Sequence, residues 1–548
     1  MTFHQLLREP ITLLDGAMGT MLLRDGLPAG ELPELLNLTD PERILSVHRA
    51  YARAGSQILY ANTFGANRFK LAKTGRSVAE VVEAGVGLAR RAAEETDALV
   101  ALDIGALGQM LEPAGTLTFD EAVALFRESV EAGVRAGADL IVIETMSDLG
   151  EMRAALLAAK EAGGGRPVMG TMSFGPGGRT FTGCGIPSMA LTLEGMGADA
   201  IGVNCSLGPE QMEAFVEELA AWTTRPIVVK PNAGLPDPVT NVYELAPDRF
   251  AAAMRVLVDK GARIVGGCCG TTPEHIAALK DALSGVKPGR RAERNASALC
   301  TASHFLPLDR PRLAGARIGT VGEKSTREKS LFGDMDDLLD QALDQVDEGV
   351  ELLVVDVDPA AEEAPSMMAG CVRELQGMAG VPLMLLSSRT AVLEAGLRSY
   401  HGRAIAGPVT GDDASMEAVF PLAARYGAAV IGLTVNRDGV PPTVDGRVSI
   451  AERILARAAE WGLPRERVII DCVAPRRPGE SEEEMLRALR KTKERFGVRT
   501  ALGTPFSPEC GRIGDPTLLA RALASGLDVA ILDPGEAALV KAVQDARR

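Results

Sequence analysis

The sequence predicts an α/β protein built from two consecutive (β/α)8 TIM barrels joined by a linker. Short runs rich in β-branched residues alternate with longer stretches rich in Ala, Leu and Glu along the whole chain. Continuous apolar strands separated by amphipathic helices are typical of a parallel sheet buried on both faces. Each half of the chain holds about eight such units, and 548 residues exceed what a single core supports.

The first half of the chain contains eight predicted strands. They lie at residues 11–14, 57–61, 99–103, 140–143, 167–171, 200–203, 226–230 and 263–265. Helical periodicity between them predicts helices at 41–54, 78–95, 119–136, 149–162, 209–221 and 247–260. Residues 1–285 are therefore predicted to form one barrel.

A polar or glycine-rich segment follows each of these strands. The segments are D-G-A-M-G-T from Asp15, N-T-F from Asn62, G-A-L-G from Gly105, E-T-M from Glu144, S-F from Ser173, N-C-S from Asn204, P-N-A-G from Pro231 and G-G-C-C-G from Gly266. In (β/α)8 barrels the loops that follow the strands share one face and carry the active site. We therefore expect the chemistry of the first half to lie on these loops.

The second half repeats the pattern after a break. Residues 284–312 are rich in Pro, Arg and Ser, and residues 286–312 are predicted as an interdomain linker. Further strands are predicted at 316–321, 352–356, 382–386, 404–405, 429–434, 468–471, 500–502 and 529–532, and helices at 335–348, 415–426, 450–461 and 481–496. Residues 313–548 are therefore predicted as a second barrel.

The composition excludes several classes of function. The formal net charge of −15 argues against nucleic acid as a partner and against a polybasic membrane contact. No apolar run is long enough to span a bilayer, and the N-terminus lacks the features of a signal peptide. The eight cysteines are scattered and form no disulfide framework, so we expect a reducing, cytoplasmic location.

Three of the cysteines have the placement of metal ligands. Cys268 and Cys269 are adjacent, so a disulfide between them is disfavoured, and they follow the eighth strand of the first half, whereas Cys205 follows the sixth. Three protein ligands with one open position are typical of catalytic zinc, and the metal would hold a substrate thiol as a thiolate. The alternative is that these thiols are merely small buried side chains.

The first half resembles the zinc-dependent homocysteine S-methyltransferases over residues 1–285. The resemblance rests on L-L-D-G-A-M-G-T from Leu13, A-N-T-F from Ala61, I-E-T from Ile143, G-V-N-C from Gly202, K-P-N-A-G from Lys230 and G-G-C-C-G-T-T-P-E-H-I from Gly266. This family includes the homocysteine module of cobalamin-dependent methionine synthases and the betaine–homocysteine methyltransferases. As an ordered set, the motifs are specific to it.

The resemblance implies roles for individual residues. Cys205, Cys268 and Cys269 would bind zinc, which in turn would bind the homocysteine sulfur. Asp15 and Glu144 would hold the ammonium of homocysteine, and backbone N–H groups of Ala17, Met18 and Gly19 would hold its carboxylate. Asn204 and Asn232 would add polar contacts. A turn-capping role is the alternative for Asp15.

The second half resembles the pterin-binding barrel that follows the homocysteine module in methionine synthases. The matching phrases are V-G-E from Val321, D-V-D from Asp356, V-P-L-M-L-L-S-S from Val381, Y-G-A-A-V from Tyr426 and I-I-D from Ile469. Glu323, Asp358 and Asp471 are the candidate cofactor-binding residues.

The second half departs from the pterin-binding family at several ligand positions. Asp358 stands where the family has Asn, Leu386 where it has Asp, Gly407-Pro408 where it has Asn-Ser, and Ser325-Thr326 where it has Thr-Asn; an Asn near Phe506 is also missing. Each lost partner of the pterin edge costs about 1–3 kcal/mol, so binding of methyltetrahydrofolate is in doubt.

The sequence thus predicts transfer of a methyl group to homocysteine, giving methionine. No D-x-H-x-x-G cobalamin motif is present, so methylcobalamin would be carried by a missing module or a separate corrinoid protein. Three alternatives remain open: another methyl donor such as betaine or S-methylmethionine with a degenerate second barrel, a two-barrel scaffold that docks a corrinoid protein, or a Schiff-base enzyme using Lys230.

Overall fold

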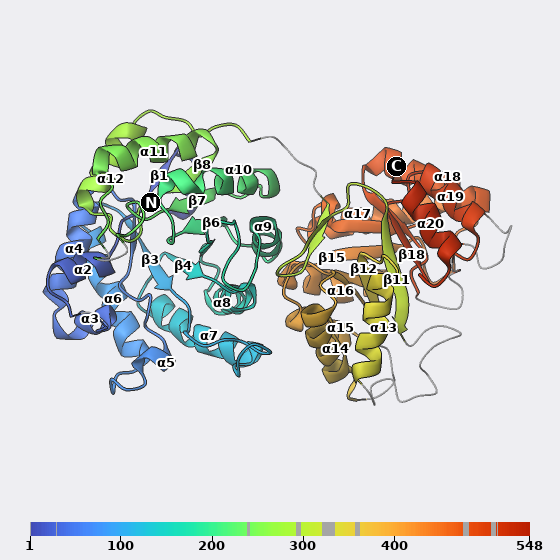
Figure 1. The fold of residues 1–548 in the computed structure, drawn as a ribbon, viewed down its shortest axis with the longest axis horizontal. Coiled ribbons are helices and arrows are strands. Elements are labelled where there is room, and N and C mark those ends of the chain that lie inside the picture. The colour runs from blue at the N-terminus through green and yellow to red at the C-terminus, as the bar shows by residue number, and fades with distance from the viewer. Residues whose placement is uncertain are drawn as a thin grey trace. The chain divides into compact units, whose positions relative to one another are not determined.

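The computed structural model describes residues 2–547 except 29, 238, 239, 241, 292–296, 320–334, 357–361, 475–481, 506–510 and 512. The chain divides into two compact units, Met1–Arg294 and Asn295–Arg548. Each unit is a parallel (β/α)8 barrel, as predicted (Figure 1). In the described part of the chain, no helix combines the length and the apolar character that crossing a bilayer requires.

The first unit contains an eight-stranded parallel sheet. Its strands are β1 (Thr12–Leu13), β2 (Ile58–Tyr60), β3 (Leu99–Ile104), β4 (Leu140–Met146), β5 (Val168–Met172), β6 (Ala200–Asn204), β7 (Ile227–Lys230) and β8 (Ala262–Val265). β1 pairs with β8, and the series continues without a gap to β2. A parallel bridge from Leu14 to Ile58 then closes the barrel.

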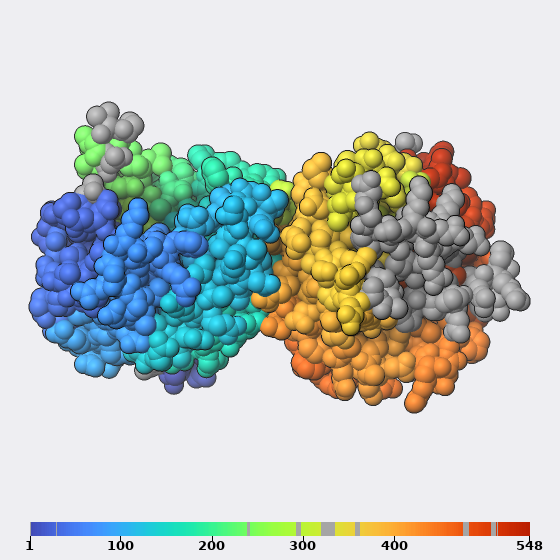
Figure 2. All heavy atoms as spheres, turned by 90° about the horizontal axis from the view of Figure 1, so that it is seen from below, coloured from blue at the N-terminus to red at the C-terminus, as the bar shows by residue number. Residues whose placement is uncertain are grey.

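Helices surround this sheet in chain order. They are α1 (Phe3–Leu6), α2 (Gly19–Arg24), α3 (Leu36–Thr39), α4 (Pro41–Ala54), α5 (Arg68–Leu71), α6 (Val78–Ala93), α7 (Phe119–Arg135), α8 (Leu149–Ala162), α9 (Ile186–Gly195), α10 (Glu213–Trp222), α11 (Pro247–Asp259) and α12 (Pro273–Leu283). Capping boxes at Ser77 and Thr118 start α6 and α7, because each hydroxyl and the following Glu satisfy backbone N–H groups at the helix start. α12 packs against α4, so green and blue segments lie side by side and the ring closes (Figures 1 and 2).

The second unit forms a closed barrel. Its strands are β11 (Arg312–Gly319), β12 (Leu352–Asp356), β13 (Leu383–Leu386), β14 (Ile405–Val409), β15 (Ala429–Leu433), β16 (Val468–Asp471), β17 (Arg499–Leu502) and β18 (Val529–Leu532). Its helices are α13 (Met335–Asp347), α14 (Ala364–Met378), α15 (Thr390–Ser399), α16 (Asp413–Tyr426), α17 (Val444–Glu460), α18 (Glu482–Phe496), α19 (Pro516–Ala524) and α20 (Ala537–Asp545). β11 begins four residues before its predicted start, and β14 extends four residues beyond its predicted end.

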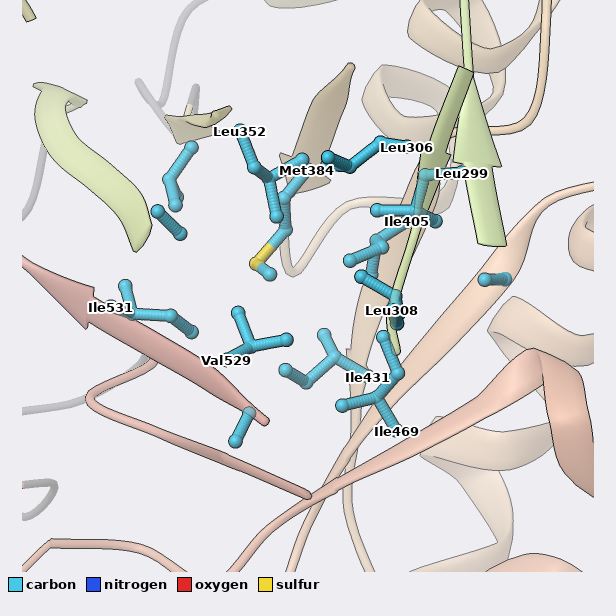
Figure 3. Packing of buried hydrophobic residues seen from close by; sticks show 14 of the residues in the cluster. Leu299, Leu306, Leu308, Leu352, Met384, Ile405, Ile431, Ile469, Val529 and Ile531 are labelled. Atoms are coloured by element: carbon cyan, nitrogen blue, oxygen red, sulfur yellow. The ribbon is translucent and has the colours of Figure 1, made fainter. Parts of the chain in front are cut away.

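The stretch predicted as a linker contains structure of its own. β9 (Ala298–Cys300) and β10 (Phe305–Pro307) form an antiparallel hairpin. Leu299, Leu306 and Leu308 of this segment pack with Met384 and Ile405 in the core of the second barrel (Figure 3). The hairpin therefore buries apolar side chains at the amino-terminal end of the strands. The predicted domain limits remain a prediction.

Candidate functional site

A layer of polar side chains lies above the apolar core of the first barrel. Side chains alternate between the inside and outside of a strand, so positions two residues apart face the same way. Core residues such as Ala101, Val142 and Val228 are each followed two positions later by a polar residue. The polar residues reached in this way are Asp103, Glu144, Thr171 and Lys230, and Asn204 lies four positions beyond Ala200 on the same side of its strand. All are buried, at the carboxyl ends of their strands.

Cys205, Cys268 and Cys269 meet at this end of the barrel. Their sulfur atoms lie within 4.8 Å of one another, and the Sγ atoms of Cys205 and Cys269 are 4.0 Å apart. Cys205 has a φ of 61°, a left-handed conformation that turns the chain sharply after β6. Gly267 permits the second loop, because a Cβ there would lie 2.4 Å from Thr271 Oγ1.

The three thiols form one coupled acid–base group. Hydrogen bonds from Cys268 and Cys269 lower the pKa of Cys205 to about 3. The contact with Cys205 raises the pKa of Cys269 to about 11, although the contact with Cys268 lowers it. Contacts with Cys205 and Cys269, together with burial, raise the pKa of Cys268 well above its usual value. A thiolate is thus stabilised among sulfur donors that converge on one point. This set of soft ligands fits zinc, with a position left for a fourth ligand.

Asn232 and Tyr243 border the triad. The side-chain oxygen of Asn232 accepts a hydrogen bond from the Cys269 backbone N–H at 3.1 Å, and its side chain also contacts the Cys205 thiol. Tyr243 hydrogen-bonds the Cys269 sulfur, and burial together with the nearby thiols raises its pKa. The structure thus places predicted residue Asn232 beside the triad. Tyr243 was not predicted, since a lone tyrosine in a loop gives no sequence signal.

Asp15 and Glu144 face the same buried cation. Lys230 Nζ lies 3.5 Å from Asp15 Oδ1 and 3.7 Å from Glu144 Oε2. The ammonium also sits 3.9 Å from the centre of the Tyr60 ring. Burial raises the pKa of both carboxyl groups, and Lys230 partly offsets this. An ion-paired Lys230 in this position is a poor candidate for a Schiff base, since its pKa lies well above the usual value.

Asn204 connects this charged group to the loop that carries Cys205. Its side-chain oxygen accepts hydrogen bonds from the Thr145 N–H at 2.9 Å and the Thr171 hydroxyl at 2.8 Å. Its amide nitrogen donates to Thr145 Oγ1 at 2.7 Å and lies 3.5 Å from Glu144 Oε2. The amide is fully buried and satisfied, so it fixes Glu144 relative to Cys205.

The turn at Ala17, Met18 and Gly19 lies between β1 and α2. The Ala17 N–H donates to Thr271 Oγ1 at 3.2 Å, so this group already has a partner. Met18 stands at the start of α2, where no side chain caps the helix. The first N–H groups of a helix point outward and attract anions.

In the second barrel, only one predicted cofactor-binding residue can be placed. Glu323 and Asp358 lie outside the described residues. Asp471 is buried at the end of β16, where Oδ1 accepts from the Val473 N–H at 2.7 Å and Oδ2 from the backbone and hydroxyl of Thr504 at 3.0 and 2.6 Å. Each of its oxygens is therefore engaged within the barrel.

Family comparisons match both halves of the chain. Residues 12–283 match the homocysteine S-methyltransferase family, and residues 318–506 match the pterin-binding enzyme family. Methionine synthase from Mycobacterium leprae (strain TN) is 30% identical over 587 residues, covering 99% of this chain and 49% of that protein. Methionine synthase from Mycobacterium tuberculosis (strain ATCC 25618 / H37Rv) is 30% identical over 566 residues, covering 96% and 48% respectively. The chain thus spans about half the length of these curated relatives.

Among solved structures, the chain is similar to the metallated form of the homocysteine methyltransferase MmuM from Escherichia coli. The identity is 28%, with 51% of this chain and 98% of that chain covered and a TM-score of 0.45.

Proposed function

We propose that the first barrel of this chain methylates homocysteine at a zinc site. The premise is that the chain contains a homocysteine S-methyltransferase domain followed by a pterin-binding domain. Both domains are distantly homologous to the N-terminal modules of methionine synthase. The observation that carries the proposal is the convergence of three thiols beside a buried pair of carboxylates. A soft metal site next to an ammonium-binding site matches a substrate that carries both a thiol and an amino group.

Cys205, Cys268 and Cys269 would hold the zinc ion. When bound, zinc lowers the pKa of a coordinated thiol, so that a thiolate nucleophile exists near neutral pH. Methyl transfer forms a carbon–sulfur bond on homocysteine, and the electron pair of the broken bond leaves with the donor. Asn232 and Tyr243 orient the Cys269 side of the triad.

The amino-acid end of homocysteine would lie on the charged group. Asp15 and Glu144 would accept hydrogen bonds from its ammonium, and the N–H groups of Met18 and Gly19 would donate to its carboxylate. Asn204 keeps Glu144 in register with the triad, so the thiol and the ammonium are held at a fixed separation. Such positioning is a large part of catalysis by metal-dependent transferases.

For the methyl donor we propose methylcobalamin carried by another module or partner, with methyltetrahydrofolate at the second barrel as the ultimate source. A second candidate, a different small methyl donor, is favoured by the second barrel itself. Leu386 is buried in its core where the resembling family has an aspartate, and both oxygens of Asp471 are engaged by Val473 and Thr504. Neither of these two positions therefore offers a free polar group to a pterin edge.

The test compares Cys269→Ala with Cys184→Ala in the full chain. Cys184 is a buried cysteine of the same barrel outside the triad, so it controls for the loss of a thiol. We expect one zinc per wild-type and Cys184→Ala chain by elemental analysis, and loss of zinc and of homocysteine methylation in Cys269→Ala. Methyl donors are supplied one at a time, with and without a corrinoid. Turnover by a metal-free Cys269→Ala protein would overturn the proposal.

A further inference from the structure

Asp103 is a buried acid of the first barrel that the proposed function leaves without a role. It lies at the carboxyl end of β3, two positions beyond the core residue Ala101, so its side chain faces the barrel interior. Only 7% of its surface is exposed. The Thr63 hydroxyl contacts the Asp103 backbone rather than its carboxylate, and among the described residues Oδ1 of Asp103 has no hydrogen-bond partner.

Asp103 shares its surroundings with the charged pair already described. Besides burial, the charge of Glu144 is the main influence that raises the pKa of Asp103, whereas Lys230 lowers it. Asp15 acts in the same direction as Glu144. β3 pairs with β4 so that Asp103 lies opposite Val142, two residues before Glu144, and the two acids therefore emerge from neighbouring strands. Lys230 is already within 3.7 Å of Glu144 and of Asp15.

The excess of carboxyl groups over lysines in this arrangement favours a second cation. A buried carboxylate without a partner is costly, and the cost disappears when a cation donates hydrogen bonds to it. Lys230 can balance one carboxylate, and an incoming ammonium would favour the ionised form of a further one, because an opposite charge nearby lowers the pKa of an acid. A primary ammonium also has three N–H donors, enough to reach several carboxylates at once.

We infer that Asp103 is a specificity-determining residue that receives the substrate ammonium together with Asp15 and Glu144, so that the barrel selects amino-acid thiols over thiols without an amino group. The inference rests on the proposed function, because it concerns the same substrate. In this arrangement Lys230 pairs with Asp15 and Glu144 within the protein. Asp103 supplies an additional carboxylate, which pairs with the ammonium of the substrate.

The experiment measures binding rather than turnover. The zinc-loaded full chain is titrated by calorimetry with L-homocysteine and with 4-mercaptobutanoic acid, which has the same thiol and carboxylate but no amino group. In Asp103→Asn, which keeps the shape and removes the charge, we expect the dissociation constant for L-homocysteine to rise about tenfold or more, as for loss of a charge-assisted hydrogen bond. The dissociation constant for 4-mercaptobutanoic acid should stay within about twofold of wild type, because this ligand has no ammonium group to pair with Asp103.

Two further variants keep the result interpretable. Glu151→Gln is the matched control, since Glu151 is a buried acid of the same barrel that accepts from the Leu107 N–H at 2.7 Å; it should leave both constants unchanged. Asp103→Ser repeats the loss of charge if Asp103→Asn does not fold. An unchanged preference for L-homocysteine in a folded Asp103 variant overturns the inference alone. Failure of the wild-type protein to bind either thiol overturns the proposed function and this inference with it.

Discussion

Replacing Lys230 by Met should destabilise the first unit strongly, because the lysine is the cation shared by Asp15 and Glu144. Methionine retains most of the length and volume of the side chain, so the change removes charge rather than packing. Lys230 is 4% exposed, and Asp15 and Glu144 are 3% and 7% exposed, so water cannot take over the role of the ammonium.

The distances set the size of the effect. At an effective dielectric constant of about 20, an ion pair at 3.5 Å gains roughly 5 kcal/mol of Coulomb energy before desolvation. Removing one partner of a buried pair costs about 3–5 kcal/mol, since the remaining charge is left uncompensated. Loss of the contact with the Tyr60 ring adds about 1–2 kcal/mol. Together these contributions predict that the free energy of unfolding of the first unit falls by about 4–7 kcal/mol at pH 8.

The loss should depend on pH with a defined sign. Burial raises the pKa of Asp15 and Glu144 above the values of the unfolded chain, and Lys230 is what lowers them again. Without the lysine these pKa values rise further, so the folded variant binds protons that the unfolded chain releases. Its stability then falls as pH increases through the acidic range. Because protonation removes the uncompensated charge, the difference from wild type should be smaller at pH 5 than at pH 8.

The assay is urea unfolding of the full chain at pH 5 and pH 8, followed by hydrogen exchange of peptides from β1, β4 and β7. Lys160→Met is the matched control, because Lys160 is 40% exposed and lies 3.9 Å from Asp199. A surface pair of this kind contributes about 0–1 kcal/mol. An equal loss for Lys230→Met at both pH values, or a loss no larger than that of Lys160→Met, would refute the reasoning.

Two further substitutions test neighbouring parts of the same barrel. Asn204→Ala leaves the Thr145 N–H and the Thr171 hydroxyl without their buried acceptor. We therefore expect the free energy of unfolding in urea to fall by about 2–4 kcal/mol, and zinc to be retained less well on dialysis. Wild-type zinc affinity in this variant would contradict the positioning role of Asn204. Burial raises the pKa of Glu151 to about 7, so wild-type stability should decline by up to about 3 kcal/mol as pH rises from the unfolded value near 4.5 to 7. Glu151→Gln should remove that decline, and an identical pH profile for the two proteins would show that Glu151 does not titrate in this range.

Periodicity was enough to predict the strands of both barrels and ten of the helices, because the alternation of apolar runs and amphipathic stretches is a local property. It failed at residues 298–307. The surrounding stretch 284–312 is rich in Pro, Arg and Ser, yet Leu299, Leu306 and Leu308 within it pack against one end of the core of the second barrel. Local composition cannot report a core that is formed by strands far away in the chain.

The proximity of the three cysteines was also within reach of the sequence, because residues that follow parallel strands must emerge on one face. The surroundings of the candidate substrate residues were not. Whether Lys230 meets Asp15, Glu144 and Tyr60 depends on which side chains of β1, β2, β4 and β7 point inward at the same height.

The order of strands, helices and strand-end motifs, and with them the thiols, was determined by the sequence alone, because each is encoded within a few neighbouring residues. The charge balance of the site was decided only by the tertiary structure. Closure of the barrel brings Asp15 and Glu144, which follow or end separate strands, to one lysine, and burial then makes the distances between these groups decide their protonation.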